Sequence, residues 1–256
     1  PRRARALLTR FARIMAVDAE AARACRRAGL PAARVRVSGA MDEGARALPC
    51  TEAERAALAR AIGSRPVWLA AALPAEEHAM IARAHQEALR TAHRLLLIVV
   101  PDRAADGPAL AAGLAGAWGL EVALRSADQE IEEETQVLIA DTEGEFGLWY
   151  RLAPVVYLGG TIAGPGSLRD PCEAAALGAA ILQGARAVPH GELLARLRSA
   201  GGARMVRDAV DLGAEQLFGI DVDKALAGHF LDVGAGGKGL FAAGQDDATH
   251  LLVPVG

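Results

Sequence analysis

The chain has 256 residues, of which 52% are apolar and 23% charged, so it can bury one large or two modest hydrophobic cores. Aromatic residues make up only 4% and the formal net charge is −3, which argues against a nucleic-acid-binding surface of stacked aromatic and basic side chains. Three scattered cysteines and the lack of a long apolar run exclude a disulfide framework and a transmembrane helix, and they favour a reducing, cytosolic setting.

The first 36 residues are rich in arginine and contain only two carboxylates, Asp18 and Glu20. Such a basic segment is typical of contact with anionic lipid, an anionic substrate or an acidic partner, and equally of a solvated helix face. Within it we expect a strand over 14–17, a helix over 19–28 and a strand over 35–37, which would be the tail of an α/β unit. Residues 38–51 are expected to form a linker.

From Arg65 onward, short apolar runs alternate with helical patterns. The expected strands are 67–70, 95–100, 121–124, 137–140, 155–158 and 180–182, and the expected helices are 74–93, 104–118, 145–152 and 172–177. This alternation predicts an α/β fold with a doubly wound parallel sheet, in which ligands bind beyond the carboxyl ends of the strands. His78, His85 and His93 lie on or beside the first helix without metal-ligand spacing, so we expect surface residues and no metal site.

The segment 159–178 carries the strongest functional signal. A glycine-rich loop leads to a helix start with Asp170 as N-cap, Pro171 at the first helical position and Glu173 shortly after. Glycines and backbone N–H groups here predict a site for an anion and a sugar, with Glu173 accepting hydroxyl hydrogen bonds. The alternative is that Glu173, like Glu145 in the loop described next, only closes a helix end.

A second loop, 141–145, has similar chemistry. Thr142 and Glu145 have the spacing of a capping box, and Gly144 would let a ligand approach the backbone. We expect the helix starts at Thr142 and Asp170 to converge at one edge of the sheet.

The order of these motifs resembles the donor-binding half of bacterial 3-deoxy-D-manno-octulosonic acid (Kdo) transferases over roughly residues 10–215. The resemblance rests on the segments 34–39, 66–71, 99–101 and 141–147, and on Gly159-Gly160 followed by 170–173 and 175–178. It implies the C-terminal, Rossmann-like domain of a GT-B glycosyltransferase. Residues 1–45 would then be a remnant of the acceptor domain with a linker, 46–218 the donor-binding domain and 219–256 a divergent glycine-rich tail.

The resemblance also implies a function. Such an enzyme transfers Kdo from CMP-Kdo to the lipid A precursor (lipid IVA) in lipopolysaccharide biosynthesis, without a cofactor, at the cytoplasmic face of the bacterial inner membrane. The implied donor-binding residues are Pro101, Asp102, Arg103, Glu143, Gly144, Glu145, Arg169, Asp170, Pro171, Cys172 and Glu173. The catalytic residue is unknown, because the family's general base is a glutamate of the N-terminal domain and has no counterpart here.

The chain also departs from the family. Asp102 replaces an arginine that would meet the anionic donor, so Arg103 or Arg169 would have to take its place. Ala72-Leu73-Pro74 replaces a polar Ser-Thr-His cluster, and a lysine is lost near Asp42. Two alternatives therefore stand beside the transferase: a degenerate, non-catalytic paralogue that binds a nucleotide sugar or a partner, and another nucleotide-sugar enzyme such as an epimerase. A Gly-x-Gly-x-x-Gly pattern at 234–239 is interpreted as accidental.

Overall fold

The computed structural model of the protein describes residues 11, 14–16, 19–37, 47–164, 169–186 and 190–213. The predicted domain boundaries at 45/46 and 218/219, the glycine-rich tail and the 234–239 pattern lie outside these residues, so the domain division stays a prediction. Within the described ranges, none of the helices has the length and apolar character needed to cross a bilayer.

The N-terminal described part is a small parallel unit. Strand β1 (Ile14–Ala16) is followed by α2 (Ala19–Arg27), a 3-10 turn η1 (Ala32–Arg34) and β2 (Val35–Val37), and the two strands pair in parallel. Ala22 of α2 and Leu30 are buried together with Ala16 of β1 and Val35 of β2, and these four residues form the small apolar centre of the unit. The predicted strand, helix and strand are confirmed.

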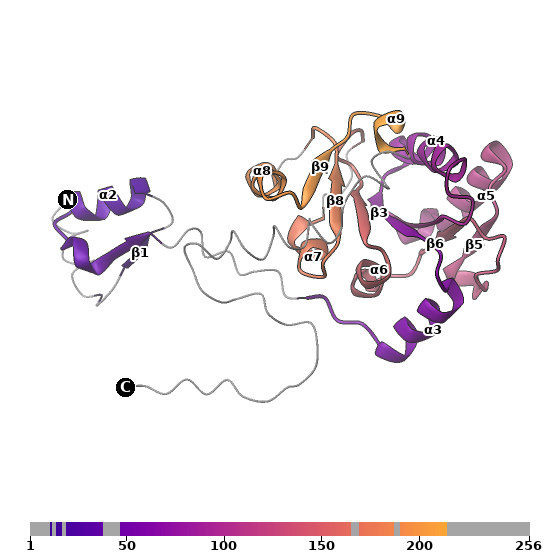
Figure 1. The fold of residues 1–256 in the computed structure, drawn as a ribbon, viewed down its shortest axis with the longest axis horizontal. Helices are drawn as coiled ribbons and strands as arrows, with labels where there is room; N and C mark the ends of the chain where they lie inside the picture. Colours follow the sequence, from indigo (N-terminus) through magenta and orange to yellow (C-terminus); the bar gives the residue numbers. More distant parts are fainter. Residues whose placement is uncertain are drawn as a thin grey trace.

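The larger part is built on a seven-stranded sheet (Figure 1). Its strands are β3 (Val67–Leu73), β4 (Leu96–Pro101), β5 (Val122–Leu124), β6 (Val137–Ile139), β7 (Val155–Leu158), β8 (Ala180–Gln183) and β9 (Ala203–Met205). They lie in the order β5-β6-β4-β3-β7-β8-β9, and every pair is parallel. The strand order reverses beside β3, so the predicted doubly wound, Rossmann-like fold is confirmed.

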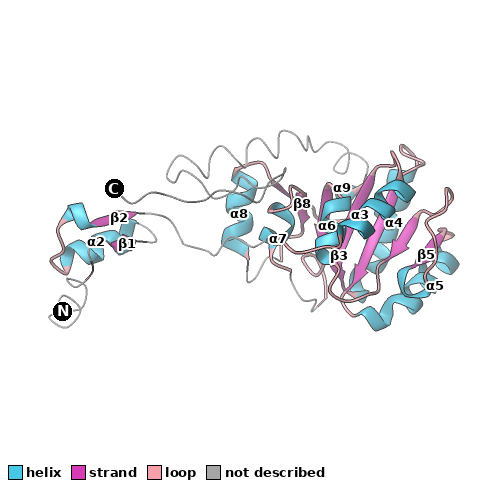
Figure 2. Ribbon diagram, turned by 90° about the horizontal axis from the view of Figure 1, so that it is seen from below, coloured by secondary structure: helices cyan, strands magenta, loops and turns pink. Residues whose placement is uncertain are grey.

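Helices cover both faces of this sheet (Figure 2), because strands that are apolar on both sides must be shielded twice. One core contains side chains of α4 (His78–Leu89), α5 (Gly107–Trp118) and α9 (Ala209–Leu212). The other contains side chains of α3 (Glu52–Ile62), α6 (Phe146–Leu152), α7 (Pro171–Ala175) and α8 (Gly191–Ser199). Among the described α-helices and strands, α3, α8, β9 and α9 have no counterpart in the sequence prediction.

The expectation that His78, His85 and His93 are surface residues is wrong for His85. His93 is exposed and His78 is half-buried, but the His85 side chain is completely inaccessible. Its Nδ1 accepts a hydrogen bond from Trp68 Nε1 at 3.2 Å, and its Nε2–H donates to the Gln136 carbonyl at 3.0 Å. Burial, opposed by the Gln136 hydrogen bond, lowers the pKa of His85 to about 4, so the imidazole is neutral at pH 7.

Candidate functional site

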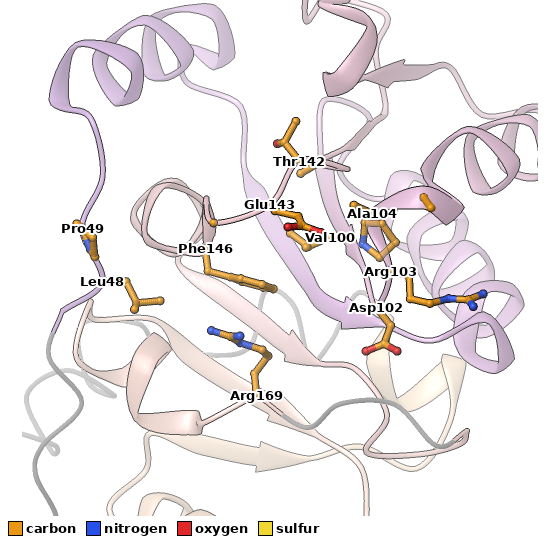
Figure 3. A pocket seen from close by; sticks show the side chains of 14 residues that line it. Leu48, Pro49, Val100, Asp102, Arg103, Ala104, Thr142, Glu143, Phe146 and Arg169 are labelled. Atoms are coloured by element: carbon orange, nitrogen blue, oxygen red, sulfur yellow. The ribbon is translucent and has the colours of Figure 1, made fainter.

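A cleft of about 500 Å³ lies at the carboxyl ends of β4 and β6 (Figure 3). This volume is within the range of small-molecule sites, and its position is where open α/β sheets bind ligands. Its walls come from the end of β4 and the loop after it, the loop after β6, the first residue of α6, the segment before α3, and Arg169, two residues before α7. The lining residues are Leu48, Pro49, Val100, Pro101, Asp102, Arg103, Ala104, Ala105, Ala140, Thr142, Glu143, Gly144, Phe146 and Arg169.

The structure separates the predicted donor-binding residues into two groups. Pro101, Asp102, Arg103, Glu143, Gly144 and Arg169 line the cleft. Glu145, Asp170, Pro171, Cys172 and Glu173 are not among its lining residues. The loop at Thr142 and the start of α7 thus meet at the same cleft, and among the described residues Arg169 is the one that lines it from the α7 side. Whether these residues bind a donor stays a prediction.

The helix start at Asp170 forms as predicted. Asp170 is the N-cap of α7, its carboxylate accepts a hydrogen bond from the Cys172 N–H at 2.9 Å, and Pro171 occupies the first helical turn. The carboxylate is therefore used to satisfy a backbone donor that the helix itself leaves unpaired. The N-cap role predicted for Asp170 is thus confirmed.

The predicted capping box between Thr142 and Glu145 is wrong. Helix α6 begins at Phe146, Glu145 occupies the N-cap position, and no side chain caps this end. The Thr142 hydroxyl instead contacts the Glu145 carboxylate directly. Gly144 has a φ of +81°, a left-handed conformation that turns the chain before the helix starts and moves Glu145 out of the position that a capping box requires.

Glu145 belongs to an ion-pair cluster behind this wall of the cleft. Arg125 Nη2 donates to Glu145 Oε1 at 2.9 Å and also contacts Glu54 of α3, and the guanidinium lies 5.7 Å from the centre of the Trp149 ring. Burial alone would raise the pKa of Glu145, but hydrogen bonds from Arg125 and Thr142 outweigh it and hold that pKa below its usual value. The cluster joins α3 to α6 and fixes the loop that carries Gly144.

In the described part of the glycine-rich loop after β7, residues 159–164, three amides are bound by the protein itself and are not open to a ligand. The N–H groups of Gly160, Ile162 and Ala163 donate to the Glu77 carboxylate at 2.9, 2.8 and 2.7 Å, and Tyr157 Oη donates to it at 3.0 Å. Glu77 is 1% exposed. The protein's own carboxylate thus occupies the anion position that the glycines create.

Sequence reasoning missed Glu77 because its importance depends on strand order. Glu77 follows β3, and β3 pairs with β7, so the residues after both strands lie at the same edge of the sheet. At this edge Gly159 approaches the backbone of Ala72 so closely that a Cβ atom would overlap it. Ala72 itself has a φ of +52°, an unusual conformation for a non-glycine residue, where β3 departs from regular pairing.

The charges of the cleft nearly cancel. Asp102 and Glu143 oppose Arg103 and Arg169 among its lining residues. Arg103 donates to Asp106 at 2.9 and 3.0 Å, and its side chain is 75% exposed. In Figure 3 it points away from Arg169. Within the described ranges, the structure has no cluster of three or more His, Cys, Asp or Glu side chains that could hold a metal.

The Arg169 side chain has more contacts with the domain than the Arg103 side chain has. Its Nε and Nη2 donate to Glu173 Oε2 at 3.0 and 2.5 Å, and its guanidinium lies 4.1 Å from the centre of the Phe146 ring. The Arg169 side chain is 30% exposed. A planar cation fixed on an aromatic face and a carboxylate is suited to the recognition of phosphate or carboxylate groups.

Comparison with known proteins confirms the resemblance to Kdo transferases. The chain is 27% identical over 147 residues to the 3-deoxy-D-manno-octulosonic acid transferase of Haemophilus influenzae, a match covering 57% of this chain and 34% of that protein. It is 31% identical over 119 residues to the probable mitochondrial 3-deoxy-D-manno-octulosonic acid transferase of Arabidopsis thaliana, covering 46% of this chain and 26% of that protein. No protein-family model matches the chain.

Among solved structures, the C-terminal CMP-Kdo binding domain of WaaA from Acinetobacter baumannii has the same fold. The TM-score is 0.64 at 23% identity, and the match covers 71% of this chain and 96% of that domain. The chain therefore shares the fold of nearly all of that domain. It spans about a third or less of the length of the two sequence relatives.

Proposed function

We propose that the α/β domain is the donor-binding half of a glycosyltransferase that takes Kdo from CMP-Kdo and transfers it to the lipid A precursor (lipid IVA). The proposal includes a place at the cytoplasmic face of the bacterial inner membrane, where lipopolysaccharide biosynthesis uses these substrates. It is supported by the sequence similarity to two Kdo transferases and by the fold shared with a CMP-Kdo binding domain. The observation that carries it is the cleft, which gathers six of the predicted donor-contacting residues.

The proposed reaction requires groups from two domains. A base must take the proton from the acceptor hydroxyl while the anomeric carbon of Kdo is attacked and CMP leaves as an anion. By family resemblance the base belongs to the N-terminal domain. The present domain would bind the cytidine compound, orient it and stabilise the negative charge of the leaving phosphate, with Arg169 in the cleft wall and the backbone at Gly144 as the nearby donors.

A second candidate function is binding of a cytidine compound without transfer. The observation that favours it is the charge balance, because Asp102 and Glu143 add negative charge to a cleft whose two arginines are already paired with carboxylates. A dianionic phosphate is bound less strongly in such a neutral site than in a basic one. A transferase and a non-catalytic paralogue would both bind CMP, but only the first would release it from CMP-Kdo in the presence of the acceptor.

Isothermal titration with CMP and with UDP tests the proposal. We expect CMP to bind and UDP to bind at least tenfold more weakly. A preference for UDP would overturn the assignment and point to another nucleotide-sugar enzyme. Glu143→Gln removes a negative charge from the cleft wall and should tighten CMP binding by about two- to fivefold, since like charges repel the phosphate. Glu133→Gln, at an exposed position before the amino end of β6, is the matched control.

A further inference from the structure

The segment 47–50, which enters the α/β domain just before α3, contributes Leu48 and Pro49 to the wall of the cleft. Figure 3 shows these two residues across the cleft from Arg103. Leu48 is half-buried and Pro49 is exposed. The segment belongs to the range 38–51, which the sequence predicts as a linker. The end of this range therefore forms part of the candidate site.

Few contacts hold the segment 47–50 in place. Its backbone lies in neither a helix nor a strand. Among the described residues, its one hydrogen bond joins the Leu48 carbonyl to Arg151 Nη1, at 2.6 Å. The Leu48 and Cys50 side chains also pack against the core on this face of the sheet. Because so few hydrogen bonds fix this segment, its position depends strongly on each of them.

Arg151 joins the segment to α6. Its Nη1 donates to the Gly147 carbonyl of α6 at 2.6 Å and also to the Leu48 carbonyl, so one nitrogen bridges the helix and the cleft wall. Gly147 permits the close approach, because a Cβ atom on it would lie 2.2 Å from the Pro49 carbonyl oxygen and 2.7 Å from that of Leu48. These distances are too short for a carbon and an oxygen that are not bonded, so this arrangement requires a glycine.

We propose that Arg151 is a positioning residue, which together with Gly147 holds the segment 47–50 against α6 so that Leu48 and Pro49 contact the nucleoside part of the ligand. The inference rests on the proposed function, since it assumes a cytidine compound in the cleft. Leu48 and Pro49 offer apolar side chains, which suit the faces of a base or a ribose and not a phosphate. A wall that is in place before binding spares the ligand the cost of ordering it.

The test compares two probes, CMP and cytidine, which share the nucleoside and differ in the phosphate. Arg151→Met keeps an apolar stem and removes the hydrogen bonds to Leu48 and Gly147. Isothermal titration of this variant, well below its thermal midpoint, should show both affinities reduced by about 3- to 10-fold and by the same factor. Wild-type affinities in the folded variant would overturn the inference. A loss confined to CMP would also overturn it, because Arg151 would then act on the phosphate.

Two further variants keep the test decisive if Arg151→Met does not fold. Leu48→Ala leaves the carbonyl that binds Arg151 and shortens the side chain in the wall, so both affinities should fall by a similar factor. Gly147→Ala introduces a better helix former into α6 but displaces the Pro49 carbonyl, and it should also weaken both probes. Wild-type affinities in these two variants would contradict the proposed role of the wall.

A spectroscopic signal and a matched control separate positioning from a purely structural role. In a nitrogen–proton correlation spectrum of the wild type, cytidine should shift the amide signals of Leu48 and Cys50, and unshifted signals would overturn the inference. Arg60→Met removes an exposed arginine of α3 outside the cleft wall and should leave both affinities within twofold of wild type. Wild-type protein that binds neither probe would contradict the proposed function itself. Wild-type binding that none of the wall variants changes would overturn the positioning role alone.

Discussion

The buried imidazole of His85 should make the stability of the domain depend on pH between about 4 and 6.5. The pKa of His85 lies near 4 in the folded domain, mainly because burial disfavours the charged form, while an unfolded chain has the ordinary histidine value near 6.5. Between these values the unfolded state binds a proton that the folded state does not. The free energy of unfolding therefore falls as the pH falls below 6.5. Well above pH 6.5 neither state binds a proton at His85, so the domain loses no stability through this residue.

The size of the effect follows from the separation of the two pKa values. Each pKa unit corresponds to about 1.4 kcal/mol, so a separation of about 2.5 units gives a loss of about 3 kcal/mol between pH 7 and pH 4. Urea unfolding measured at intervals of half a pH unit would report it. Carboxylates also titrate in this range, and the comparison must therefore be made between matched variants.

His85→Gln is the informative variant. A glutamine can accept from Trp68 Nε1 and donate to the Gln136 carbonyl, so it can replace both hydrogen bonds without a titrating group. We expect its stability to depend on pH less steeply than that of wild type, by about 3 kcal/mol over the interval. His93→Gln, at an exposed position, is the control and should keep the wild-type slope. Equal slopes in wild type and His85→Gln would refute the reasoning.

Three further predictions concern the stability of the domain and can be checked by urea or thermal unfolding. Gly107→Ala should lower the free energy of unfolding by about 1–3 kcal/mol, because a Cβ atom there would overlap the buried Asp141. Gly113→Ala in the same helix meets open space and should raise the free energy of unfolding by about 0.5–1 kcal/mol. Gln183→Met should raise the free energy of unfolding by about 1 kcal/mol, because both polar atoms of this completely buried side chain lack a hydrogen-bond partner within the part of the chain that the structure describes. Unchanged or lower stability would contradict this account. Glu77→Gln should lower the free energy of unfolding by about 2–3 kcal/mol by breaking the carboxylate contacts that hold the glycine-rich loop, while Glu76→Gln, at an exposed neighbour, should change it by less than about 0.5 kcal/mol.

Sequence patterns identified the strands of the central sheet well, because buried parallel strands are short, continuously apolar runs. Val155–Leu158 was predicted to the residue, and β4 and β6 within one residue at each end. Apolar periodicity did not predict α3, because its alanine-rich segment has no clear apolar stripe. It did not predict β9 either, because the three residues of this strand include an exposed arginine. Edge elements bury little apolar surface and leave a weak signal.

For the candidate site, the sequence predicted several of the residues that come together but not the contacts that their side chains make. The order of the loops placed Pro101, Gly144 and Arg169 in one cleft, because the carboxyl ends of the parallel strands β4, β6 and β7 lie at the same edge of the sheet. The sequence also predicted the Asp170 N-cap, because this cap depends on a hydrogen bond between residues only two positions apart, Asp170 and Cys172.

What each carboxylate contacts was decided by the tertiary structure. Glu77 binds the glycine-rich loop 83 to 86 residues away, and Arg125 joins Glu54 to Glu145 across three separate elements. Such partners are determined by strand order and by the requirement that every buried charged group find hydrogen-bond donors or an opposite charge. The amino-acid sequence alone therefore determined a parallel α/β domain with a ligand cleft at its strand ends, because apolar periodicity and local caps are short-range properties. Folding decided which polar groups remain available to a ligand, because their long-range partners exist only once the sheet has formed.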